Sequence, residues 1–479
     1  MMISVDRIYI NGAFVRPHGT AEHAQINPAT KVVIGRTLLG DAEDVDRAVA
    51  AARAAFPAFS RTDVAERQAL LRRLHDAVQA READLVRATM DEYGSPLKDT
   101  IARTRFAARA FLLARDTLET FAFERRIGRA VVRMEPLGVV GIITPWNANY
   151  TLLCSKLATA IAAGCTAVVK PSELSALQTN VLLECIHAAG LPAGVVNVVN
   201  GTGEVVGEAI SGHPEIALIS FTGSTRVGKR ILQQASQTIK RVTLELGGKS
   251  ANIILDDADL DRAIPLAVRI AFANSGQACV AGTRLLVPRS RLGEVRERLA
   301  REVAAVKVGD PWDEATTIGP LVSQTQYDRV QRYIHLGIDE GAKLLMGGPG
   351  HPPGLEHGHF VKPTVFENVS PDMTIAQEEI FGPVLCLMHY DTEEQAIDIA
   401  NGTIYGLAAY VSGTDLPRAR RVAARLVAGR VLINRAESSE PTAPFGGFKQ
   451  SGLGREYGPF GLEGHLEPKA VMDDEGELP

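Results

Sequence analysis

The feature of this sequence that most limits its fold is a series of short apolar runs, rich in valine and isoleucine, that alternate with helix-length segments. From residue 131 these runs read VVGIITP, TAVVKP, VVNVVNG, LISFTGS, VTLELGG and ANIILDD. Strands that alternate with helices predict a parallel sheet, and strands buried on both faces are expected to be apolar throughout, as these are. The fold class is therefore predicted to be α/β.

Two further regions extend this pattern. A second series of strands and helices begins near residue 283 with RLLVP and continues through KLLMGG, PTVFENV, PVLCLMHY, AAYVS and RVLIN. Residues 41 to 126 carry Ala, Arg, Glu and Leu at helical spacing, which predicts a helical lead-in. A chain of 479 residues is too long for a single core, so we expect several domains.

The distribution of charge and apolar residues excludes several classes of partner. The chain has 51 basic and 56 acidic residues and a net charge of −5, so we expect no nucleic-acid partner. Asp6 and Arg7 interrupt the apolar run that a signal peptide would need. The longest apolar run, residues 157–169, is shorter than the roughly 18 residues that span a bilayer, so we expect buried core and no membrane association.

The cysteines point to a reducing compartment. There are five, an odd number without close-set pairs, and no Cys/His spacing suggests a metal site, so we expect reduced thiols in a cytoplasmic protein without bound metal. Four lie in apolar surroundings and are assigned to packing. These four are Cys154, Cys165, Cys185 and Cys386.

Polar residues and glycines follow several of the apolar runs. Because the carboxyl ends of parallel strands meet at one edge of a sheet, these residues are expected to converge on one crevice, where α/β proteins bind their ligands. They are Trp146 and Asn147, Lys170 and Glu173, Gly223 and Ser224, and Glu245 with Gly247 and Gly248.

The segment FTGSTRVGK leaves two interpretations open. Gly223 to Lys229 matches the start of a phosphate-binding loop, which makes a nucleotide triphosphatase an alternative. Arg230, however, stands where that loop needs a Ser or Thr to hold magnesium. The remaining inference is that Gly223 and Ser224 lead into a helix N-terminus, which favours an anion such as a pyrophosphate. The chain has no G-x-G-x-x-G motif, so dinucleotide binding would be non-standard.

The segment KPSE places a cation at a strand end and a carboxylate one turn later. Lys170 and Glu173 could hold the two hydroxyls of a ribose, or they could form an ordinary surface salt pair or capping box. A carboxylate accepts hydrogen bonds from a ribose 2′-OH and repels a 2′-phosphate. If Glu173 contacts a cofactor, it therefore favours NAD over NADP.

Three residues are candidates for covalent catalysis. Cys279 lies in SGQACVAG, whose small side chains would let a substrate carbonyl approach the sulfur, although most free cysteines are simply buried hydrophobes. Glu245 lies in an apolar strand, where burial would raise its pKa and suit it as a base, unless backbone amides satisfy it. Asn147 could donate to a developing oxyanion, or it could be a turn residue.

Seven motifs together resemble the aldehyde dehydrogenase superfamily, in that family's order and spacing, over residues 8 to 472. They are GIITPWN, KPSE, FTGSTRVG, LELGGKS, GQACVAG, EEIFGPV and PFGGFKQSGLGRE. The resemblance implies that Cys279 attacks the aldehyde to give a thiohemiacetal, whose oxyanion is held by the Cys279 N–H and the Asn147 amide. It implies a thioester that Glu245 then hydrolyses, with Lys156 relaying a proton, instead of transfer to coenzyme A.

The same resemblance implies a cofactor site and an architecture. Lys170 and Glu173 would contact the adenosine ribose of NAD, Gly223 and Ser224 its pyrophosphate, and Glu379 its nicotinamide ribose, with Phe381 and Trp146 nearby; NADP is less favoured. The implied domains are an NAD-binding domain (1–116 and 137–247), a catalytic domain (248–447), and a β-ribbon oligomerisation arm with the C-terminal tail (117–136 and 448–479). A homodimer or homotetramer is expected.

The resemblance also locates a substrate pocket. Asn149 stands where the family commonly has proline, and positions 148, 155 and 439, aromatic in many relatives, are Ala148, Ser155 and Ser439 here. This predicts a roomy pocket for a bulky aromatic, branched or terpenoid-like aldehyde. Tyr150 and Phe445 are expected as its walls, with Arg435 and Glu437 at its entrance. The alternatives are a semialdehyde dehydrogenase with an acidic substrate and a non-catalytic binding or structural relative.

Overall fold

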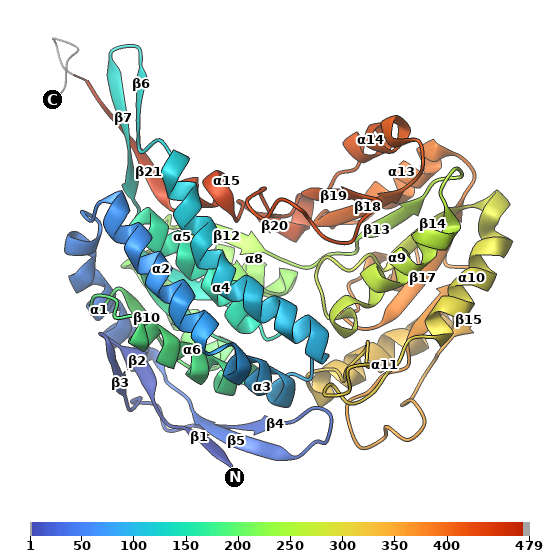
Figure 1. Ribbon diagram of the computed structural model, residues 1–479, viewed down its shortest axis with the longest axis horizontal. Coiled ribbons are helices and arrows are strands. Elements are labelled where there is room, and N and C mark those ends of the chain that lie inside the picture. The colour runs from blue at the N-terminus through green and yellow to red at the C-terminus, as the bar shows by residue number, and fades with distance from the viewer. Residues whose placement is uncertain (1, 473–479) are drawn as a thin grey trace.

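The computed structural model of the chain describes residues 2–472. Within that range two large sheets lie side by side, each covered by helices, and a narrow β-ribbon projects from the body (Figure 1). Every apolar run noted in the sequence forms a strand, and most of these strands pair in parallel. The predicted α/β fold class is confirmed.

The first large sheet has eight strands among the described residues, in the order β20-β12-β11-β8-β9-β10-β2-β3. Its five central strands, from β12 to β10, are parallel, and β20, β2 and β3 add antiparallel edges. The bounds are β2 (Ile8–Ile10), β3 (Ala13–Val15), β8 (Val139–Ile143), β9 (Thr166–Lys170), β10 (Val196–Val198), β11 (Ile216–Thr222), β12 (Arg241–Glu245) and β20 (Gly452–Leu453).

Helices cover both faces of this sheet because alternate strand residues point to opposite sides. Val140 and Ile142 of β8 join one hydrophobic cluster, with residues of α2, α4, α5 and α6, whereas Val139 and Ile143 join another, with α1, α7 and α8. The helices are α1 (Ala42–Phe59), α2 (Val64–Ala80), α3 (Glu82–Glu92), α4 (Leu97–Thr120), α5 (Asn149–Ala163), η1 (Glu173–Ser175), α6 (Ala176–Ala188), η2 (Gly203–Gly207), α7 (Glu208–Gly212) and α8 (Thr225–Ala235).

The helical lead-in begins where its sequence satisfies free backbone donors. The Asp41 side chain caps α1 by accepting from the N–H groups of Glu43 and Asp44. The Asp63 side chain caps α2 by accepting from the Glu66 N–H, and the Glu66 carboxylate accepts from the Asp63 N–H. Each capping box stabilises a helix by about 1 kcal/mol. The predicted helical region at 41–126 is confirmed through Thr120.

The second large sheet has seven strands among the described residues, in the order β15-β16-β17-β14-β13-β18-β19, and all but β15 run parallel. The strands are β13 (Ala251–Ile254), β14 (Arg284–Pro288), β15 (Lys343–Met346), β16 (Thr364–Glu367), β17 (Val384–Tyr390), β18 (Ala408–Ser412) and β19 (Arg430–Ile433). The helices that accompany it are α9 (Leu260–Phe272), η3 (Ala273–Gly276), η4 (Arg289–Arg291), α10 (Leu292–Ala304), α11 (Gln324–Asp339), α12 (Thr374–Gln377), α13 (Glu393–Asn401) and α14 (Leu416–Ala424).

The projecting ribbon is an antiparallel sheet of β6 (Glu124–Ile127), β7 (Ala130–Pro136) and β21 (Leu466–Val471). The predicted arm began at residue 117, but α4 continues to Thr120 because Leu118 packs into the helical core, so the ribbon begins at β6. The division into domains and the oligomeric arm stay predictions, and residues 473–479 of the predicted tail lie outside the described residues. The other short elements are β1 (Ile3–Val5), β4 (Glu22–Ile26), β5 (Val33–Leu38), η5 (Lys449–Ser451) and α15 (Gly458–Glu463).

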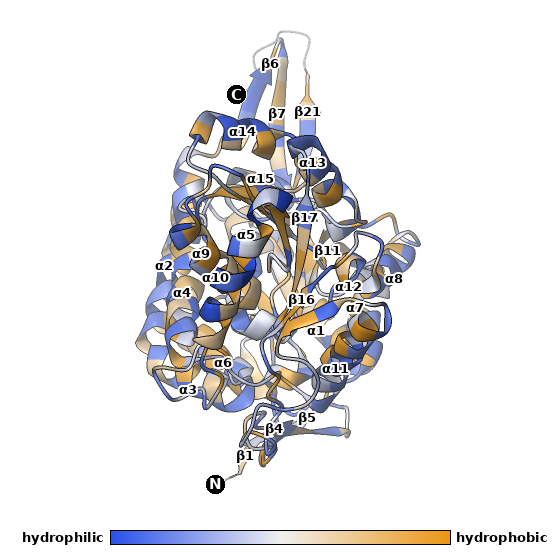
Figure 2. Cartoon of the chain, turned by 90° about the vertical axis from the view of Figure 1, so that its right-hand side faces the viewer, coloured by the Kyte–Doolittle hydropathy of each residue, from blue (hydrophilic) through white to orange (hydrophobic). Residues whose placement is uncertain are grey.

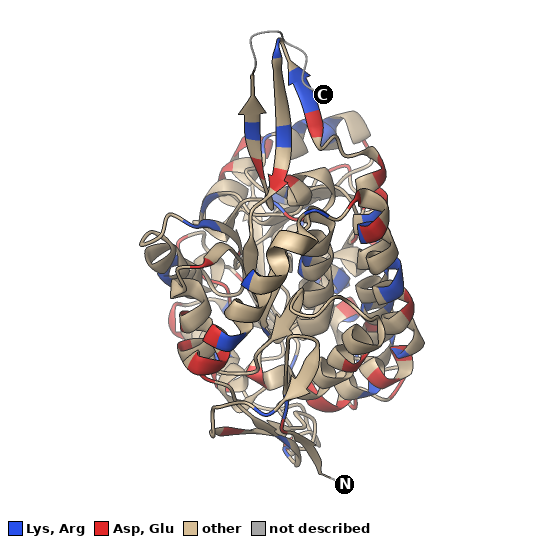
Figure 3. Cartoon of the chain, turned by 90° about the vertical axis from the view of Figure 1, so that its left-hand side faces the viewer, with Lys and Arg blue, Asp and Glu red and all other residues tan. Residues whose placement is uncertain are grey.

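The surface and the interior differ as a folded globular chain requires. Figure 2 shows hydrophobic residues on β11, β16 and β17, between helices that carry hydrophilic residues. On the face drawn in Figure 3, acidic and basic residues are interspersed over the helices. No helix within residues 2–472 is long and apolar enough to cross a membrane. Over the same residues no group of three or more His, Cys, Asp or Glu side chains could hold a metal ion.

Candidate active site

The loop that carries Cys279 has an unusual backbone. Asn274, Ser275 and Gly276 lie consecutively in the left-handed region, with φ of 57°, 58° and 73°. Such conformations cost energy for residues other than glycine and persist only when the surroundings enforce them. A side chain at Gly276 could not be accommodated, because its Cβ would lie 2.2 Å from the carbonyl carbon of Gly382.

Hydrogen bonds hold this loop in place. The side-chain amides of Asn147 and Asn274 both donate to the Gln277 carbonyl, each at 2.9 Å, and Asn274 also donates to the Asn147 carbonyl at 3.2 Å. The Ser275 hydroxyl accepts from Gly319 N–H at 3.0 Å. Asn147, at the carboxyl end of β8, is thereby fixed beside the Cys279 loop. An amide nitrogen carries two hydrogens, so Asn147 keeps one N–H to donate elsewhere.

Cys279 differs from the other cysteines in its exposure. It is partly accessible, whereas Cys154, Cys165, Cys185 and Cys386 are buried. Burial raises the pKa of the Cys279 thiol to about 12, and the carboxylates of Glu379 and Glu245 add to the increase. The thiol is therefore protonated at neutral pH, and a nearby base or positive charge must help to form the thiolate.

Glu245, the last residue of β12, is a candidate base whose charge acts on Cys279. Its side chain is buried, and neither carboxylate oxygen has a hydrogen-bond partner among the described residues. Burial raises its pKa well above the ordinary value, and the charge of Glu456 raises it further, while Lys156 lowers it. The alternative of a carboxylate satisfied by backbone amides is therefore wrong. A desolvated carboxylate without partners is suited to accept a proton.

Lys156 reaches the site from α5. Its ammonium forms a buried ion pair with Glu456 and donates to the Ser220 hydroxyl at 3.0 Å. The charges of both partners act on Glu245, so the three groups form one electrostatic cluster. The sequence analysis gave Glu456 no role, although it ends the motif PFGGFKQSGLGRE; its burial beside Lys156 was not visible in that pattern.

The glycines after Glu245 let two segments approach the Cys279 loop. A Cβ on Gly248 would lie 2.4 Å from the Cys279 carbonyl oxygen, and one on Gly247 would lie 2.5 Å from a carboxylate oxygen of Glu379. Gly248 N–H donates to Glu379 Oε1 at 2.9 Å, and burial raises the pKa of Glu379 to about 7. The motif LELGG thus places Cys279, Glu245 and Glu379 together.

Two aromatic rings lie beside this cluster. Trp146 and Phe381 meet edge to face with their ring centroids 5.4 Å apart, and Trp146 also contacts Tyr93. Phe381 has a φ of 66° and follows Glu379 closely in the chain. The rings therefore form an apolar wall between the end of β8 and the segment that leads into β17.

A charged pair lies at the end of β9, one strand away from Asn147. The buried Lys170 ammonium donates to Glu173 Oε2 at 2.8 Å. Burial acts to raise the pKa of Glu173, but Lys170 outweighs it and the net shift is downward, so Glu173 is ionised at neutral pH. An ionised carboxylate can accept hydrogen bonds from ribose hydroxyls.

The glycine-rich segment forms a strand-to-helix turn and not a phosphate loop. Ser224 caps α8, its hydroxyl accepting from Val227 N–H at 3.4 Å, and Thr225 onward is already helical. Gly223 N–H donates to the Glu245 carbonyl at 3.0 Å, which ties the turn to β12. The triphosphatase alternative is wrong because most of its would-be loop is helix. The N-terminus of α8 remains available to an anion.

A cavity of about 860 Å³, open to solvent, begins next to Cys279. Val280 lines it, and the Tyr410 hydroxyl donates to the Val280 carbonyl at 2.9 Å. Phe445 lines it as predicted. Its remaining walls are Phe106, Ala408, Tyr410, Arg430, Leu432, Ala436, Glu437, Ser438, Pro441 and Tyr457. Except for Phe445 and Glu437, the sequence analysis did not place these residues near the substrate, because they become neighbours only in the folded chain.

Two predicted pocket residues are corrected. Tyr150 is not in the cavity wall: it is buried in α5, where its hydroxyl lies 2.5 Å from the Thr104 hydroxyl, because the ring packs into the helical layer against α4. Ser439 also lies outside the wall, since it is exposed and accepts a hydrogen bond from Arg435 at the rim. Its neighbour Ser438 lines the cavity instead.

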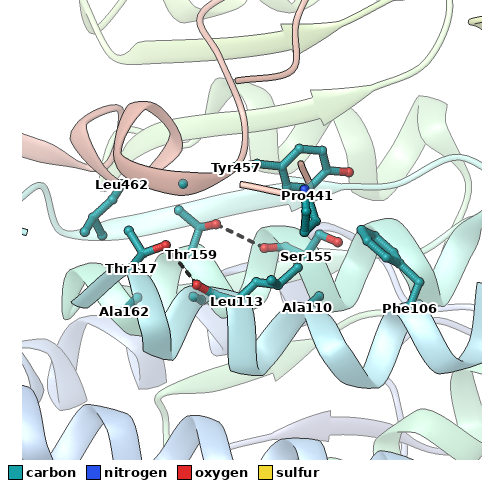
Figure 4. Close-up of a pocket in the computed structure, with 12 residues that line it drawn as sticks. Phe106, Ala110, Leu113, Thr117, Ser155, Thr159, Ala162, Pro441, Tyr457 and Leu462 are labelled. Carbon is teal, nitrogen blue, oxygen red and sulfur yellow. Dashed lines mark hydrogen bonds between the residues drawn. The ribbon is translucent and has the colours of Figure 1, made fainter. Parts of the chain in front are cut away.

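A narrow groove adjoins the cavity between α4 and α5 (Figure 4). The two hollows share Phe106, Pro441 and Tyr457. Ser155 lines the groove, and Figure 4 shows it facing Pro441 and Tyr457. A large side chain at position 155 would fill this space, so the small serine supports the predicted roomy pocket.

Comparison with known proteins identifies the family. The model of the "Aldehyde dehydrogenase family" matches residues 14–471. A 3-succinoylsemialdehyde-pyridine dehydrogenase from a Pseudomonas species is 48% identical over 470 residues, which are 98% of each chain. The chain belongs to the aldehyde dehydrogenase family, and the predicted fold and enzyme class are confirmed.

Solved structures agree with this assignment. A cysteine-to-alanine variant of aldehyde dehydrogenase C from Pseudomonas syringae, complexed with NAD⁺ and octanal, superposes with a TM-score of 0.97 at 48% identity and covers 99% of this chain and 97% of its own. An NAD⁺ complex of an aldehyde dehydrogenase from Bacillus cereus has a TM-score of 0.94 at 40% identity, with coverage of 98% and 96%.

Proposed function

We propose that the protein oxidises an aldehyde to a carboxylic acid with NAD as hydride acceptor, through a thioester on Cys279. The observation that carries the proposal is the convergence of Cys279, Glu245 and Asn147 around one loop, whose next residue, Val280, lines an open cavity: a partly exposed cysteine, a buried unpartnered carboxylate and an amide with a free N–H. Covalent acyl chemistry needs these three functions within reach of one carbonyl.

The residues at the strand ends fit NAD. Lys170 and Glu173 would hold the adenosine ribose, Gly223 and Ser224 would place helix N–H groups near the pyrophosphate, and Glu379 would accept from the nicotinamide ribose. The fit is supported by the ionised Glu173, by Gly247, whose missing side chain leaves room beside the Glu379 carboxylate, and by the Trp146–Phe381 wall. The chemistry that bound NAD supplies is hydride acceptance. The NAD⁺ complexes of the relatives support the same cofactor.

The first step belongs to Cys279 and Asn147. The Cys279 thiol would release its proton to a water molecule, its sulfur would form a bond to the aldehyde carbon, and the carbonyl π electrons would move to the oxygen. The second N–H of Asn147 and the Cys279 backbone N–H would donate to that oxyanion, an arrangement in which each donor contributes about 3 kcal/mol to transition-state stability. The hydrogen bonds of Asn147 and Asn274 to Gln277 keep the loop in this orientation.

The second step belongs to Glu245. Its carboxylate would take a proton from water, the water oxygen would attack the thioester carbon, and the C–S bond would break to release Cys279 as the thiolate. Lys156 and Glu456, which form a buried ion pair whose charges act on Glu245, would pass that proton away from the site. The presence of this base favours hydrolysis over transfer to coenzyme A.

The cavity and groove favour a bulky or extended aldehyde. Most of the residues that line both are apolar or aromatic, and together they can bury a ligand much larger than acetaldehyde. Octanal in the complex of one relative, and the pyridine-bearing semialdehyde in the name of another, support an aromatic or long-chain substrate for this chain. A substrate with an acidic end remains the second candidate, favoured by the positive charge of Arg430 in the cavity wall.

NADH formation tests the proposal. The purified protein would be given NAD⁺ or NADP⁺ with acetaldehyde, benzaldehyde, octanal and branched aldehydes. We expect NADH from bulky aldehydes with NAD⁺, a lower kcat/KM for acetaldehyde, and none with Cys279→Ala. Equal kcat/KM for acetaldehyde and benzaldehyde would contradict the bulky substrate, and NADH from Cys279→Ala would contradict the mechanism.

A further inference from the structure

One arginine lines the aldehyde cavity, and strand geometry explains how its side chain comes to be there. Arg430 is the first residue of β19, whose parallel register pairs it with Ala408 of β18 and pairs Leu432 with Tyr410. Residues two apart on a strand share a face. All four residues line the cavity, so the guanidinium belongs to its wall.

The guanidinium of Arg430 has no acceptor in the protein. Burial lowers the pKa of three arginines, Arg67, Arg284 and Arg430. Arg67 donates to the Ala162 carbonyl, and Arg284 donates to three carbonyls. Within residues 2–472, Arg430 makes no side-chain hydrogen bond and no ion pair, and its guanidinium carbon lies 5.0 Å from the centroid of the Phe445 ring. Its donors therefore face the cavity unsatisfied.

The positive charge lies close to the reacting groups. The charge of Glu245 acts on Arg430 and on Cys279 alike, and the rings of Tyr410 and Tyr457 border the guanidinium in the same wall. An apolar substrate that filled this part of the cavity would remove water from the five N–H donors and leave them without partners, at a cost to binding. A substrate with an oxygen acceptor at that place would satisfy them.

We propose that Arg430 makes the enzyme select aldehydes that carry a second oxygen acceptor, a ketone carbonyl or a carboxylate, a short distance from the reacting carbon. The inference rests on the proposed function and narrows its substrate class. Planar guanidinium groups bind carboxylates through paired charge-assisted hydrogen bonds and carbonyls through single ones. The exposed Glu437 lies at the rim of the same cavity, where solvent screens its repulsion of an acid.

Three isosteric aldehydes test this selection: 4-methylpentanal, 4-oxopentanal and 4-oxobutanoate, which have the same number of non-hydrogen atoms. The kcat/KM of each would be measured by NADH formation for the wild type, Arg430→Met and Arg430→Lys. Arg289→Met is the matched control, because it removes an exposed positive charge, paired with Asp391, that lies outside the cavity wall. Turnover of 4-methylpentanal, which needs no acceptor partner, reports whether each variant is folded and competent.

The expected result is a change in the ratio of substrates. In Arg430→Met, kcat/KM relative to 4-methylpentanal falls about 10-fold for the ketone and about 100-fold for the carboxylate, and Arg430→Lys recovers part of the preference for the carboxylate. Arg289→Met leaves the ratios within about twofold. An equal change in kcat/KM for all three aldehydes in Arg430→Met would mean that the arginine acts on Glu245. That result would overturn this inference and leave the proposed function standing. Absence of NADH from every aldehyde with the wild type would overturn the proposed function as well.

Discussion

The two large sheets contribute to the active site from opposite ends of their strands. In the first sheet the functional residues follow the strands: Asn147 follows β8, Lys170 ends β9, and Glu245 ends β12. In the second sheet they precede the strands: Cys279 lies before β14, and Glu379 before β17. The carboxyl edge of one sheet therefore faces the amino edge of the other across the cavity.

The first sheet follows a general rule of parallel sheets, whereas the arrangement of the second is particular to this fold. Ligand sites at carboxyl edges follow from the geometry of parallel sheets, and the first sheet obeys that rule. The second sheet does not, because its amino edge is the one turned toward the cofactor residues. The two edges also divide the proposed chemistry, since bond formation to the substrate belongs to the second sheet and hydrolysis to the first.

The largest expected effect comes from the amino edge of the second sheet. Replacing Cys279 by alanine removes the nucleophile, so we expect NADH formation to fall about 10⁵-fold. Cys386→Ala is the matched control: it removes a buried thiol from β17 of the same sheet, and its kcat is expected to change less than about threefold although the protein loses stability. A similar loss of activity in both variants would contradict the special role of Cys279.

The next effect comes from the carboxyl edge of the first sheet. In Glu245→Gln the thiol can still form the thioester, but its hydrolysis loses the base, so we expect the steady-state rate to fall about 10³-fold. Rapid-mixing measurements are expected to show one equivalent of NADH per active site before the slow phase. If the variant is slow and shows no initial equivalent of NADH, Glu245 is needed before hydride transfer. That result would contradict the assignment of hydrolysis alone to the edge of the first sheet.

A third prediction concerns pH. Because the pKa of Glu245 is raised, its base form increases with pH, and the deacylation rate is expected to rise from acidic to alkaline pH. The Lys156 charge lowers that pKa, so Lys156→Met is expected to move the rising limb about one unit toward alkaline pH. Its free energy of unfolding should also fall by about 3 kcal/mol, since Glu456 loses its partner.

The control for this pH shift is Lys469→Met, which breaks a pair with Glu135 on the exposed ribbon. Its pH profile is expected to match the wild type, and its stability to change by less than about 1 kcal/mol. The measurement is the deacylation rate across the pH range for the wild type, Lys156→Met and Lys469→Met. A shift toward acidic pH in Lys156→Met, or no shift, would contradict the claim that the charge of Lys156 lowers the pKa of Glu245.

The smallest expected effect concerns the cofactor. Glu173→Gln removes the charge that would repel a 2′-phosphate and keeps the shape of the side chain, so we expect the ratio of kcat/KM for NADP to that for NAD to rise about 10-fold. Glu22→Gln, which breaks an exposed pair with Arg36, is the control and should leave the ratio unchanged. An unchanged ratio in Glu173→Gln would mean that this edge of the sheet does not select the cofactor.

The strands and the first edge of the site could be predicted from the sequence because their causes are local. Val- and Ile-rich runs define buried strands, and the residues that follow them, such as Asn147 and Glu245, occupy the carboxyl edge by rule. Cys279 was found through its small neighbours and the family resemblance. The left-handed backbone of the loop before it, at residues 274–276, could not be predicted, because contacts with Gly382 and Gly319 from distant segments impose it.

The cavity could be predicted only in part. The family resemblance placed Tyr150 in its wall, but the helix turns its ring toward α4 instead. Arg430 was overlooked because it sits in an ordinary strand, RVLIN, and only the pairing of β18 with β19 brings its side chain to the substrate. Specificity depends on such distant neighbours, which a single sequence does not reveal.

The covalent intermediate is the most direct test of the account. Glu245→Gln would be mixed with NAD⁺ and octanal, quenched, and its intact mass and peptides measured. The account predicts the mass of one octanoyl group on the peptide that contains Cys279, and no such mass when NAD⁺ is omitted. An unmodified Cys279 after one equivalent of NADH has formed, or an acyl group on another residue, would contradict it.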